Sequence, residues 1–277
     1  MQTFYFLHIP KTAGSTFCFS VLPEIFEADR ICHAHDYPQL LPMLAEGLEK
    51  YRLFRGHFYY FFTRLLPVRP TILTFLRDPV DRVLSLYDHI CREPEHFQHA
   101  AMPKPPNGLL DAVRSLRLLP PSFQVTALAC DLDPVRTMDL ARVANPQGLD
   151  EYSVIYNEMI RRVPSRKDLA IACRRLEEMD YVGLVEHYDE SLKLASATFG
   201  WPPLQCQRWN VAPARTLRDE IKPAIVREIV QANELDFELY EFGKALFAKR
   251  VEGIAGSLPL TARAQRQEKP ITTIVAE

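Results

Sequence analysis

The segment that most constrains the fold is a short apolar run followed directly by a loop of small and hydroxylated residues. Phe4 to Ile9 is almost unbroken in apolar character, which is typical of a strand buried on both faces. It stops at the loop Pro10–Thr16, and a helix is predicted from Ser15 to about Phe26, with Ser15 or Thr16 as its N-cap. Loop amides and the positive helix end both attract negative charge, so this arrangement favours an anion-binding turn.

The alternation of strands and helices continues along the chain. We therefore predict an α/β fold, a P-loop-type parallel sheet covered by helices on both faces, with C-terminal helices. One domain is expected over 1–255, with a proline-rich helical insertion at 93–150 that could cover the acceptor, and a mobile tail at 256–277. Further strands are predicted at 30–33, 52–56, 71–76 and 181–185, and helices at 38–49, from Pro79 with Asp78 as cap, at 109–119, 169–179, 191–199, 224–232 and 234–250.

Composition narrows the function classes. The 277 residues are 47% hydrophobic with a net charge of -2, which suits one sizeable core and gives no bulk positive charge for nucleic acid or anionic lipid. Six cysteines lie far apart without a C-x-x-C pair, which disfavours zinc knuckles and disulfide scaffolds. No segment has the pattern of a signal peptide or a transmembrane segment, so a soluble, cytoplasmic protein is expected.

The residues of the first loop are suited to a phosphate or sulfate group. Lys11 supplies a mobile positive charge, Gly14 allows close backbone approach, and the hydroxyls of Ser15 and Thr16 can donate hydrogen bonds. The lysine precedes the glycine, so the loop lacks the nucleotide-triphosphatase order G-x-x-x-x-G-K-[ST]. The alternative is an ordinary strand-to-helix turn with a surface lysine.

A second motif runs from Phe75 to Tyr87. Arg77 follows a predicted strand, at the edge where open α/β sheets bind ligands, and its guanidinium can bind a phosphate through two hydrogen bonds. Ser85 lies two turns into the following helix, on the face that also carries Arg82 and His89. The alternative is a solvated helix face with a structural pair between Arg77 and Asp81.

Together the two motifs resemble the PAPS-dependent sulfotransferases, in which PAPS is 3'-phosphoadenosine 5'-phosphosulfate and PAP is its product. Within them they resemble the carbohydrate branch that includes heparan and uronyl 2-O-sulfotransferases. Weaker similarity covers 55–58, 181–186 and 233–240. The resemblance implies that the 5'-phosphosulfate is held by Lys11, Thr12, Ala13, Gly14, Ser15 and Thr16, and the 3'-phosphate by Arg77 and Ser85.

The same resemblance gives two further residues a role. His57 follows a predicted strand and is expected to be the catalytic base, because a neutral imidazole can take a proton from a hydroxyl; the alternative is a structural histidine. Where the cytosolic branch carries R-K-G-x-x-G, this chain has a different segment at 208–216, and Arg215 is the expected nucleotide contact there. Lys11 is expected to stabilise the leaving phosphate.

The expected substrates are PAPS and a hydroxyl-bearing acceptor, a carbohydrate or glycolipid, with no metal required. His33 and His35 form an alternating pair, but no third ligand is evident in the sequence. Two rivals remain open. One is a P-loop kinase acting on a small molecule, which predicts Mg-dependent ATP turnover. The other is a non-catalytic PAP- or glycan-binding protein, which predicts PAP binding without transfer.

Overall fold

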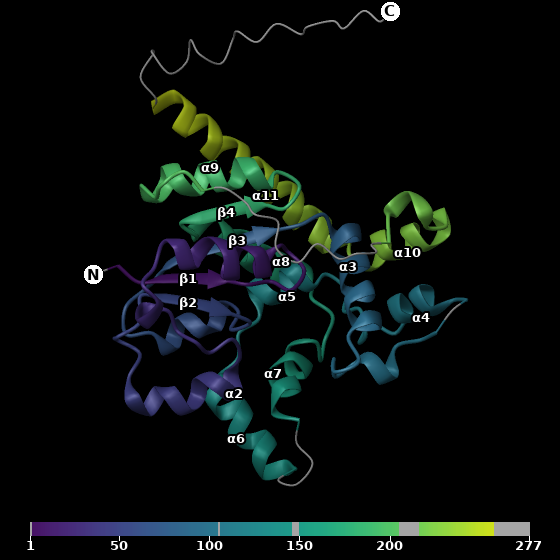
Figure 1. Cartoon of the computed structure of the whole chain (residues 1–277). Helices are drawn as coiled ribbons and strands as arrows, with labels where there is room; N and C mark the ends of the chain where they lie inside the picture. The colour runs from purple at the N-terminus through teal and green to yellow at the C-terminus, as the bar shows by residue number, and fades with distance from the viewer. Residues whose placement is uncertain (1, 105, 146–149, 205–215, 258–277) are drawn as a thin grey trace, which may run out of the picture.

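A parallel sheet forms the centre of the molecule. The computed structural model of the chain describes residues 2–104, 106–145, 150–204 and 216–257 (Figure 1). Its strands β1 (Phe4–Leu7), β2 (Leu53–Gly56), β3 (Thr71–Leu76) and β4 (Tyr181–Leu184) are parallel, in the order β2-β1-β3-β4. All four carboxyl ends therefore lie at one edge of the sheet. The predicted α/β fold is confirmed.

Helical segments cover both faces of this sheet. Side chains alternate along β1, so Phe4 and Phe6 point to one face and Tyr5 to the other. Phe4 contacts the ring of Phe199 on α9 (Tyr188–Phe199), with ring centroids 5.4 Å apart. Tyr5 contacts Phe62, with centroids 4.9 Å apart, in a 3-10 turn that covers the opposite face. The core thus extends through two layers around the sheet.

The remaining helices surround this centre. A second apolar cluster joins α3, α4 and α10, which lie together on one side of the molecule in Figure 1. It contains Val83 and Ile90 of α3, Val113 of α4 and Ile229 of α10. The helix bounds are α1 (Gly14–Thr16), α2 (Tyr37–Leu40), α3 (Pro79–Arg92), α4 (Gly108–Arg114), α5 (Phe123–Ala129), α6 (Pro134–Ala144), α7 (Glu151–Met159), α8 (Arg166–Glu178), α10 (Pro223–Ala232) and α11 (Glu234–Ser257).

Helix α3 confirms the clearest helix prediction. The Asp78 carboxylate accepts hydrogen bonds from the amides of Val80 and Asp81, and Pro79 occupies the first helical position. Its apolar stripe packs into the second cluster as the periodicity predicts. The start of this helix, which directly follows β3, is therefore fixed by local sequence.

Four predicted elements differ in the structure. The helix predicted at 109–119 is α4, which ends at Arg114, and Leu116 beyond it has a left-handed φ of 57°. The helix after the first loop is broken into α1, a π-helical turn at Phe17–Val21 and a 3-10 turn at Leu22–Glu24, where Pro23 lacks a donor. The predicted strand at 30–33 is only an isolated bridge between Ile31 and Leu53. The predicted helix at 38–49 is α2 plus a 3-10 turn at Leu41–Glu46, because Pro42 interrupts the α-helical hydrogen bonding.

The segment predicted as an insertion contains a core helix. All seven residues of α5 are buried, and this helix packs against α8 and α11. Helix α6 also falls inside 93–150, and the lid role of the segment stays a prediction. Helix α11 continues to Ser257, and the rest of the predicted tail, 258–277, lies outside the described residues. No helix within the described ranges is both long and apolar enough to cross a bilayer.

Candidate active site

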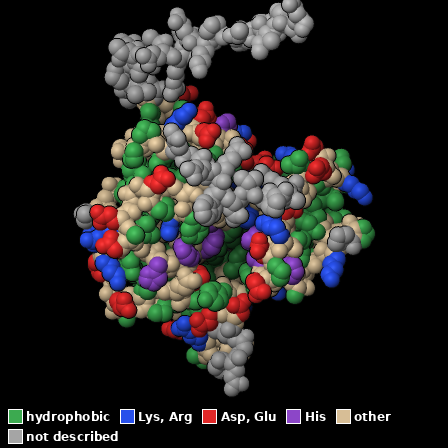
Figure 2. Space-filling view, viewed as in Figure 1, with side chains coloured by type: hydrophobic (Ala, Val, Ile, Leu, Met, Phe, Trp, Pro, Cys, Tyr) green, Lys and Arg blue, Asp and Glu red, His purple; other side chains and the backbone are tan. Residues whose placement is uncertain are grey.

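A cavity of about 1290 Å³ opens at the edge where the strands end. Residues directly after each strand line it: His8 after β1, His57 after β2, Arg77 after β3 and Val185 after β4. Figure 2 shows this hollow on one face of the molecule, with histidine side chains at its rim. Open parallel sheets bind ligands at this edge, so the position of the cavity is typical of a ligand-binding site.

The predicted anion loop forms one wall of the cavity. Lys11 and Ala13 have positive φ angles of 71° and 58°, although neither is a glycine. Such conformations cost about 1–2 kcal/mol per residue, and left-handed residues in turns create backbone concavities that bind anions. Glycine at either position would relieve this strain. Strained backbone occurs mainly at functional sites, so we interpret these two residues as part of one. The loop residues that line the cavity are Pro10, Lys11, Ala13, Gly14, Ser15 and Thr16.

Two predictions about this loop need refinement. Helix α1 begins after Ala13, so Ser15 and Thr16 lie inside the helix and do not cap it. The Thr12 side chain is fully buried, and its hydroxyl donates to the Ile9 carbonyl at 2.8 Å. That hydroxyl stabilises the turn rather than facing the cavity.

Gly14 is required by a neighbour in the cavity wall. A Cβ atom placed on Gly14 would lie 1.9 Å from Cδ2 of His8. Any side chain at this position would force the His8 ring to move. The glycine thus lets the ring that follows β1 pack directly against the start of α1.

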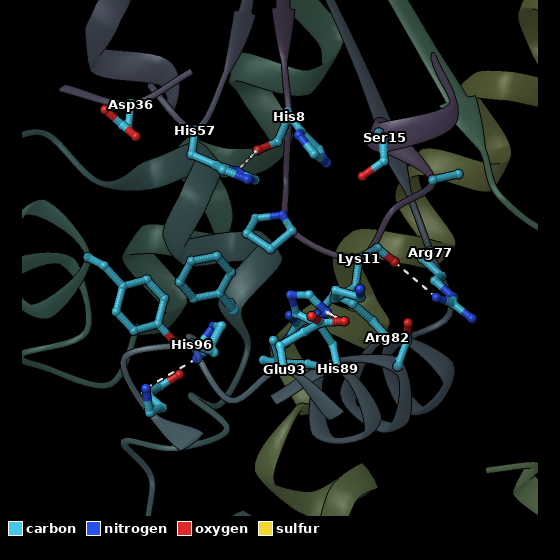
Figure 3. A pocket seen from close by; sticks show the side chains of 18 of the residues that line it. His8, Lys11, Ser15, Asp36, His57, Arg77, Arg82, His89, Glu93 and His96 are labelled. Atoms are coloured by element: carbon cyan, nitrogen blue, oxygen red, sulfur yellow. Dashed lines mark hydrogen bonds and ion pairs between the residues drawn. The ribbon is translucent and has the colours of Figure 1, made fainter. Parts of the chain in front are cut away.

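The side chain of Lys11 is a half-buried cation. The pKa of Lys11 is lowered to about 8, mainly by burial and also by the nearby Arg92, against the raising effects of Glu93 and Asp88. Figure 3 shows Lys11 between the His8 and His57 rings and Arg77. A bound anion would raise this pKa, because it stabilises the protonated amine.

Arg77 is attached directly to the loop. Its side chain is 95% removed from solvent, and Nη1 donates to the Lys11 carbonyl at 3.0 Å (Figure 3). Nε of Arg77 has no hydrogen-bond partner among the described residues. Ser85 lines the same cavity from α3. The structure therefore brings both predicted motifs together around one space.

His57 has a defined orientation at the same edge. Its Nδ1 lies 3.1 Å from the His8 carbonyl oxygen, which can only accept, so the proton is on Nδ1 and Nε2 is left as an acceptor. The two imidazole rings stack with centroids 4.4 Å apart. Burial lowers the pKa of His57 to about 4, against the raising effect of the His8 carbonyl, and His35 and Lys11 lower it too. The ring is thus neutral near pH 7.

The Sulfotransferase family model matches residues 2–243, which include every element around this cavity. The chain belongs to the Sulfotransferase family. The predicted recognition is therefore confirmed at the level of the family, and residues at 10–16 and 77–85 lie inside the matched region.

Curated relatives place the sulfotransferase near a carbohydrate branch. The chain is 24% identical over 283 residues to heparan-sulfate 6-O-sulfotransferase 2 of Danio rerio, covering 89% of this chain and 58% of the relative. It is 26% identical over 193 residues to heparan-sulfate 6-O-sulfotransferase 1 of Cricetulus griseus, covering 65% and 45%. Both are 6-O-sulfotransferases, whereas the motifs resemble the 2-O-sulfotransferases.

A third relative has a different acceptor in its name. The chain is 33% identical over 86 residues to a protein-tyrosine sulfotransferase of Arabidopsis thaliana, covering 30% of this chain and 16% of the relative. In each of these three alignments the chain spans less than two thirds of the relative's length. The similarity therefore supports membership of the family. It does not identify the acceptor, which has to be inferred from the residues of the site.

Arg82 lies on the same face of α3 as Ser85, as predicted, and lines the cavity. Its side chain is 0% exposed, so the alternative of a solvated helix face is wrong for this residue. Its Nε lies 4.0 Å from Oδ2 of the buried Asp236, and the guanidinium lies 5.5 Å from the Phe123 ring centroid. Around Arg82, α3 therefore meets α5 and α11, and the buried Asp236 carboxylate balances the arginine charge.

Aromatic side chains form a second part of the cavity lining. Phe97 contacts Tyr156, with centroids 5.4 Å apart, and Tyr156 contacts Phe123 at 5.6 Å. We call Phe97, Phe123, Tyr156 and Tyr59 the aromatic wall, and Pro10–Thr16 with Arg77 and Ser85 the loop end. Carboxylates also line the cavity, at Asp36, Asp88, Glu93, Glu95, Asp150, Glu186 and Asp189.

Two histidines join the aromatic wall to the loop end. His89 and His96 line the cavity, and their rings meet edge to face with centroids 5.6 Å apart. Burial lowers the pKa of His89 to about 4, helped by Lys11 and His96, while Glu93 raises it. His89 was predicted on the same face as Ser85, and the cavity confirms that position.

The remaining predicted contact cannot be placed. Arg215 lies outside the described residues, as does most of 208–216. Thr216, the next residue, donates from its amide and its hydroxyl to the Asp88 carboxylate at 2.8 and 2.6 Å. Asp88 lines the cavity, so the chain reaches the edge of the site directly after Arg215.

Sequence reasoning missed several residues of the site. His8 was detectable, because it follows the first strand just as His57 and Arg77 follow theirs. Gln124 gave no signal, since its segment is far from the motifs. Asp236 lies in the weakly similar stretch 233–240, but the sequence gave it no site role. Both are fully buried and contact the backbone around Arg77 or α5.

Proposed function

We propose that this chain transfers the sulfuryl group of PAPS to a hydroxyl of a carbohydrate or glycolipid acceptor. The observation that carries the proposal is the hydrogen bond between Arg77 and the Lys11 carbonyl, which joins two anion-binding motifs beside one cavity. Donors of this class carry two separate anionic groups, a 5'-phosphosulfate and a 3'-phosphate. Membership of the Sulfotransferase family and the names of the 6-O-sulfotransferase relatives favour the same reading.

The loop end would hold the donor. In this proposal the backbone of Thr12, Ala13 and Gly14, with the hydroxyls of Ser15 and Thr16, receives the 5'-phosphosulfate beside the Lys11 ammonium. Arg77 and Ser85 receive the 3'-phosphate, and the free Nε of Arg77 is one donor for it. Arg215 is proposed as a further contact from outside the described residues. Each of the two anionic groups of the donor thus has its own set of binding residues.

His57 would act as the base. Its Nδ1–H is occupied by the His8 carbonyl, so Nε2 can take the proton from the acceptor hydroxyl. As that oxygen attacks, the new oxygen–sulfur bond forms while the bond from sulfur to the 5'-phosphate oxygen breaks. The proton ends on His57 and the electron pair on the leaving phosphate.

Lys11 would stabilise the charge that develops on that leaving phosphate. A fixed cation in a partly desolvated site is worth about 10²–10³-fold in rate when it is aimed at developing charge. Its protonated form is needed, and the anionic donor favours that form. The chemistry therefore rests on positioning and electrostatics from groups at the loop end.

The acceptor would occupy the aromatic wall. Aromatic side chains pack against the apolar faces of sugar rings and leave hydroxyls free to be oriented by polar neighbours. The tyrosine sulfotransferase relative raises a second candidate, a phenolic hydroxyl, because the same wall would accept an aromatic ring.

A transfer assay with PAPS tests the proposal. We expect sulfate to appear on an unsulfated oligosaccharide, and the His57→Ala variant to form this product about 10²–10⁴-fold more slowly. Sulfation of a tyrosine peptide alone would overturn the carbohydrate acceptor and keep the donor. Mg-dependent ATP turnover would support the kinase rival, and PAP binding without transfer to any hydroxyl would support the non-catalytic rival.

A further inference from the structure

Gln124 makes a two-point contact with the main chain of Arg77. Its Oε1 accepts from the Arg77 amide at 3.0 Å, and its Nε2 donates to the Arg77 carbonyl at 2.9 Å. The side chain of Gln124 is 0% exposed. Arg77 is the first residue beyond β3, where strand pairing with β4 has ended at Leu76. A side-chain amide therefore takes the place that a neighbouring strand would fill.

Gln124 is itself held from α11. The Asp236 carboxylate accepts from the amides of Gln124 and Val125, at 3.0 and 2.8 Å. Asn233, at the start of the same helix, accepts from the Ser122 amide at 2.9 Å. The first amides of a helix have no partner within the helix, and here buried side chains satisfy them. The start of α5 is thus fixed against α11 next to the cavity.

The guanidinium of Arg77 is held separately. Its Nη1 donates to the Lys11 carbonyl, so the residue is anchored at its main chain by Gln124 and at its side chain by the anion loop. Two anchors on opposite ends of one arginine leave its conformation little freedom. A preorganised guanidinium loses less entropy on binding a phosphate than a mobile one.

We propose that Gln124 is a positioning residue that sets the discrimination between donors with and without a 3'-phosphate. It acts through Arg77 and does not itself touch the donor. This inference rests on the proposed function, in which Arg77 receives the 3'-phosphate. We call the two hydrogen bonds between the Gln124 side-chain amide and the Arg77 main chain the clamp. Without the clamp, the Arg77 main chain loses both partners, and the guanidinium is no longer held in one orientation.

The test is the ratio of two dissociation constants, for adenosine 5'-phosphate and for PAP, measured by calorimetry. We expect the wild-type protein to prefer PAP by roughly 10- to 100-fold, the range for charge-assisted hydrogen bonds. Gln124→Met keeps the length of the side chain and removes both bonds, and its ratio should fall about tenfold toward that of Arg77→Ala. A merely structural role would lower thermal stability and leave the ratio unchanged.

Val125→Ala is the matched control. Val125 is the next residue of α5 and is also fully buried, but its side chain makes no clamp on Arg77. We expect this variant to lose thermal stability and keep the wild-type ratio. If Gln124→Met also keeps that ratio, the positioning role is wrong. If the wild-type protein does not prefer PAP, the donor assignment of Arg77 fails first, which separates the two claims.

Gln124→Glu provides a second route if the methionine variant does not fold. The introduced carboxylate can accept from the Arg77 amide but cannot donate to the Arg77 carbonyl. Protonation restores a donor, so the ratio, relative to wild type at each pH, should recover as the pH falls. A ratio that shows no such recovery would contradict the clamp.

Discussion

The loop end and the aromatic wall of the cavity are built in different ways. The loop end comes from two contiguous motifs and is fixed by buried polar contacts, such as those from Arg77 to Lys11 and to Gln124. The aromatic wall is assembled from segments far apart in sequence and is held by ring packing between Phe97, Phe123 and Tyr156. Directional hydrogen bonds specify one ligand geometry, whereas ring packing tolerates several.

This difference predicts a division of labour between donor and acceptor. Changes at the loop end should affect PAP binding or the chemical step by large factors. Changes at the aromatic wall should affect the acceptor alone, by small factors.

Replacing His57 with alanine should have the largest effect. We expect turnover to fall by about 10²–10⁴-fold, because no other described group is oriented with a free acceptor nitrogen by the His8 carbonyl. PAP affinity should stay within a factor of two or so of wild type. His33→Ala is the control, since His33 is exposed and does not line the cavity. Full turnover by the His57 variant would end the base assignment.

Replacing Lys11 with alanine should lower turnover by about 10²–10³-fold, through lost stabilisation of the leaving phosphate. Lys104, which is exposed and outside the cavity lining, is the matched lysine control. Steady-state rates with PAPS and a fixed acceptor check this result. A Lys11 variant that loses only PAPS affinity, with unchanged turnover, would make the lysine a binding group and nothing more.

Replacing Arg77 with alanine should weaken PAP by about 10- to 100-fold and leave adenosine 5'-phosphate nearly unaffected. The physical reason is the loss of a charge-assisted contact to the 3'-phosphate alone. Calorimetry on both nucleotides measures it. Equal weakening of both would indicate that Arg77 supports the loop through its bond to the Lys11 carbonyl and reads no phosphate.

The pH dependence should be bell-shaped. His57 works as a base only when neutral, so the rate falls as the pH drops through its pKa, which is about 4 in the free protein. Lys11 works only when protonated, so the rate falls as the pH rises through its pKa of about 8. Each limb should approach about tenfold per pH unit. With PAPS saturating, both limbs should move upward, because the donor's negative charge favours the cationic forms.

Lys11→Arg separates the two limbs of that profile. Arginine stays protonated, so the alkaline limb should move out of the measurable range while the acid limb remains. An unchanged alkaline limb would assign it to another group.

Replacing Phe97 with alanine should have the smallest effect. Phe97 is 46% exposed and contacts Tyr156 and His96, so its loss should raise the acceptor KM by about 2- to 10-fold. PAP affinity should not change. A large loss of PAP affinity would show that the loop end and the aromatic wall do not act independently, which would contradict separate sites for donor and acceptor.

The sequence predicted the loop end because its residues are contiguous and follow strands. Lys11, Gly14, Arg77 and Ser85 all belong to motifs whose spacing is fixed by one strand-to-helix turn. The parallel sheet was predictable for the same reason, since short apolar runs ended by turns define β1 to β4. His57 lies at the predicted edge, and its role stays a proposal.

The aromatic wall and the clamp on Arg77 could not be predicted. Helices α5, α6 and α7 are short, and prolines such as Pro134 mark their boundaries, so they lack a clear 3.6-residue pattern. The full burial of Arg82 could not be predicted, because its balancing charge, Asp236, is more than 150 residues away in the sequence. Contacts between distant segments carry no local signal.

Thermal denaturation with PAP, ADP and ATP–Mg tests the central claim most directly, because PAP alone among them carries the 3'-phosphate that we propose Arg77 and Ser85 receive. At a hundredfold excess over its Kd, PAP should raise the midpoint by roughly 5 °C, and ADP and ATP–Mg at the same concentration by much less. Equal or greater stabilisation by ATP–Mg would contradict the sulfotransferase donor site and favour a kinase.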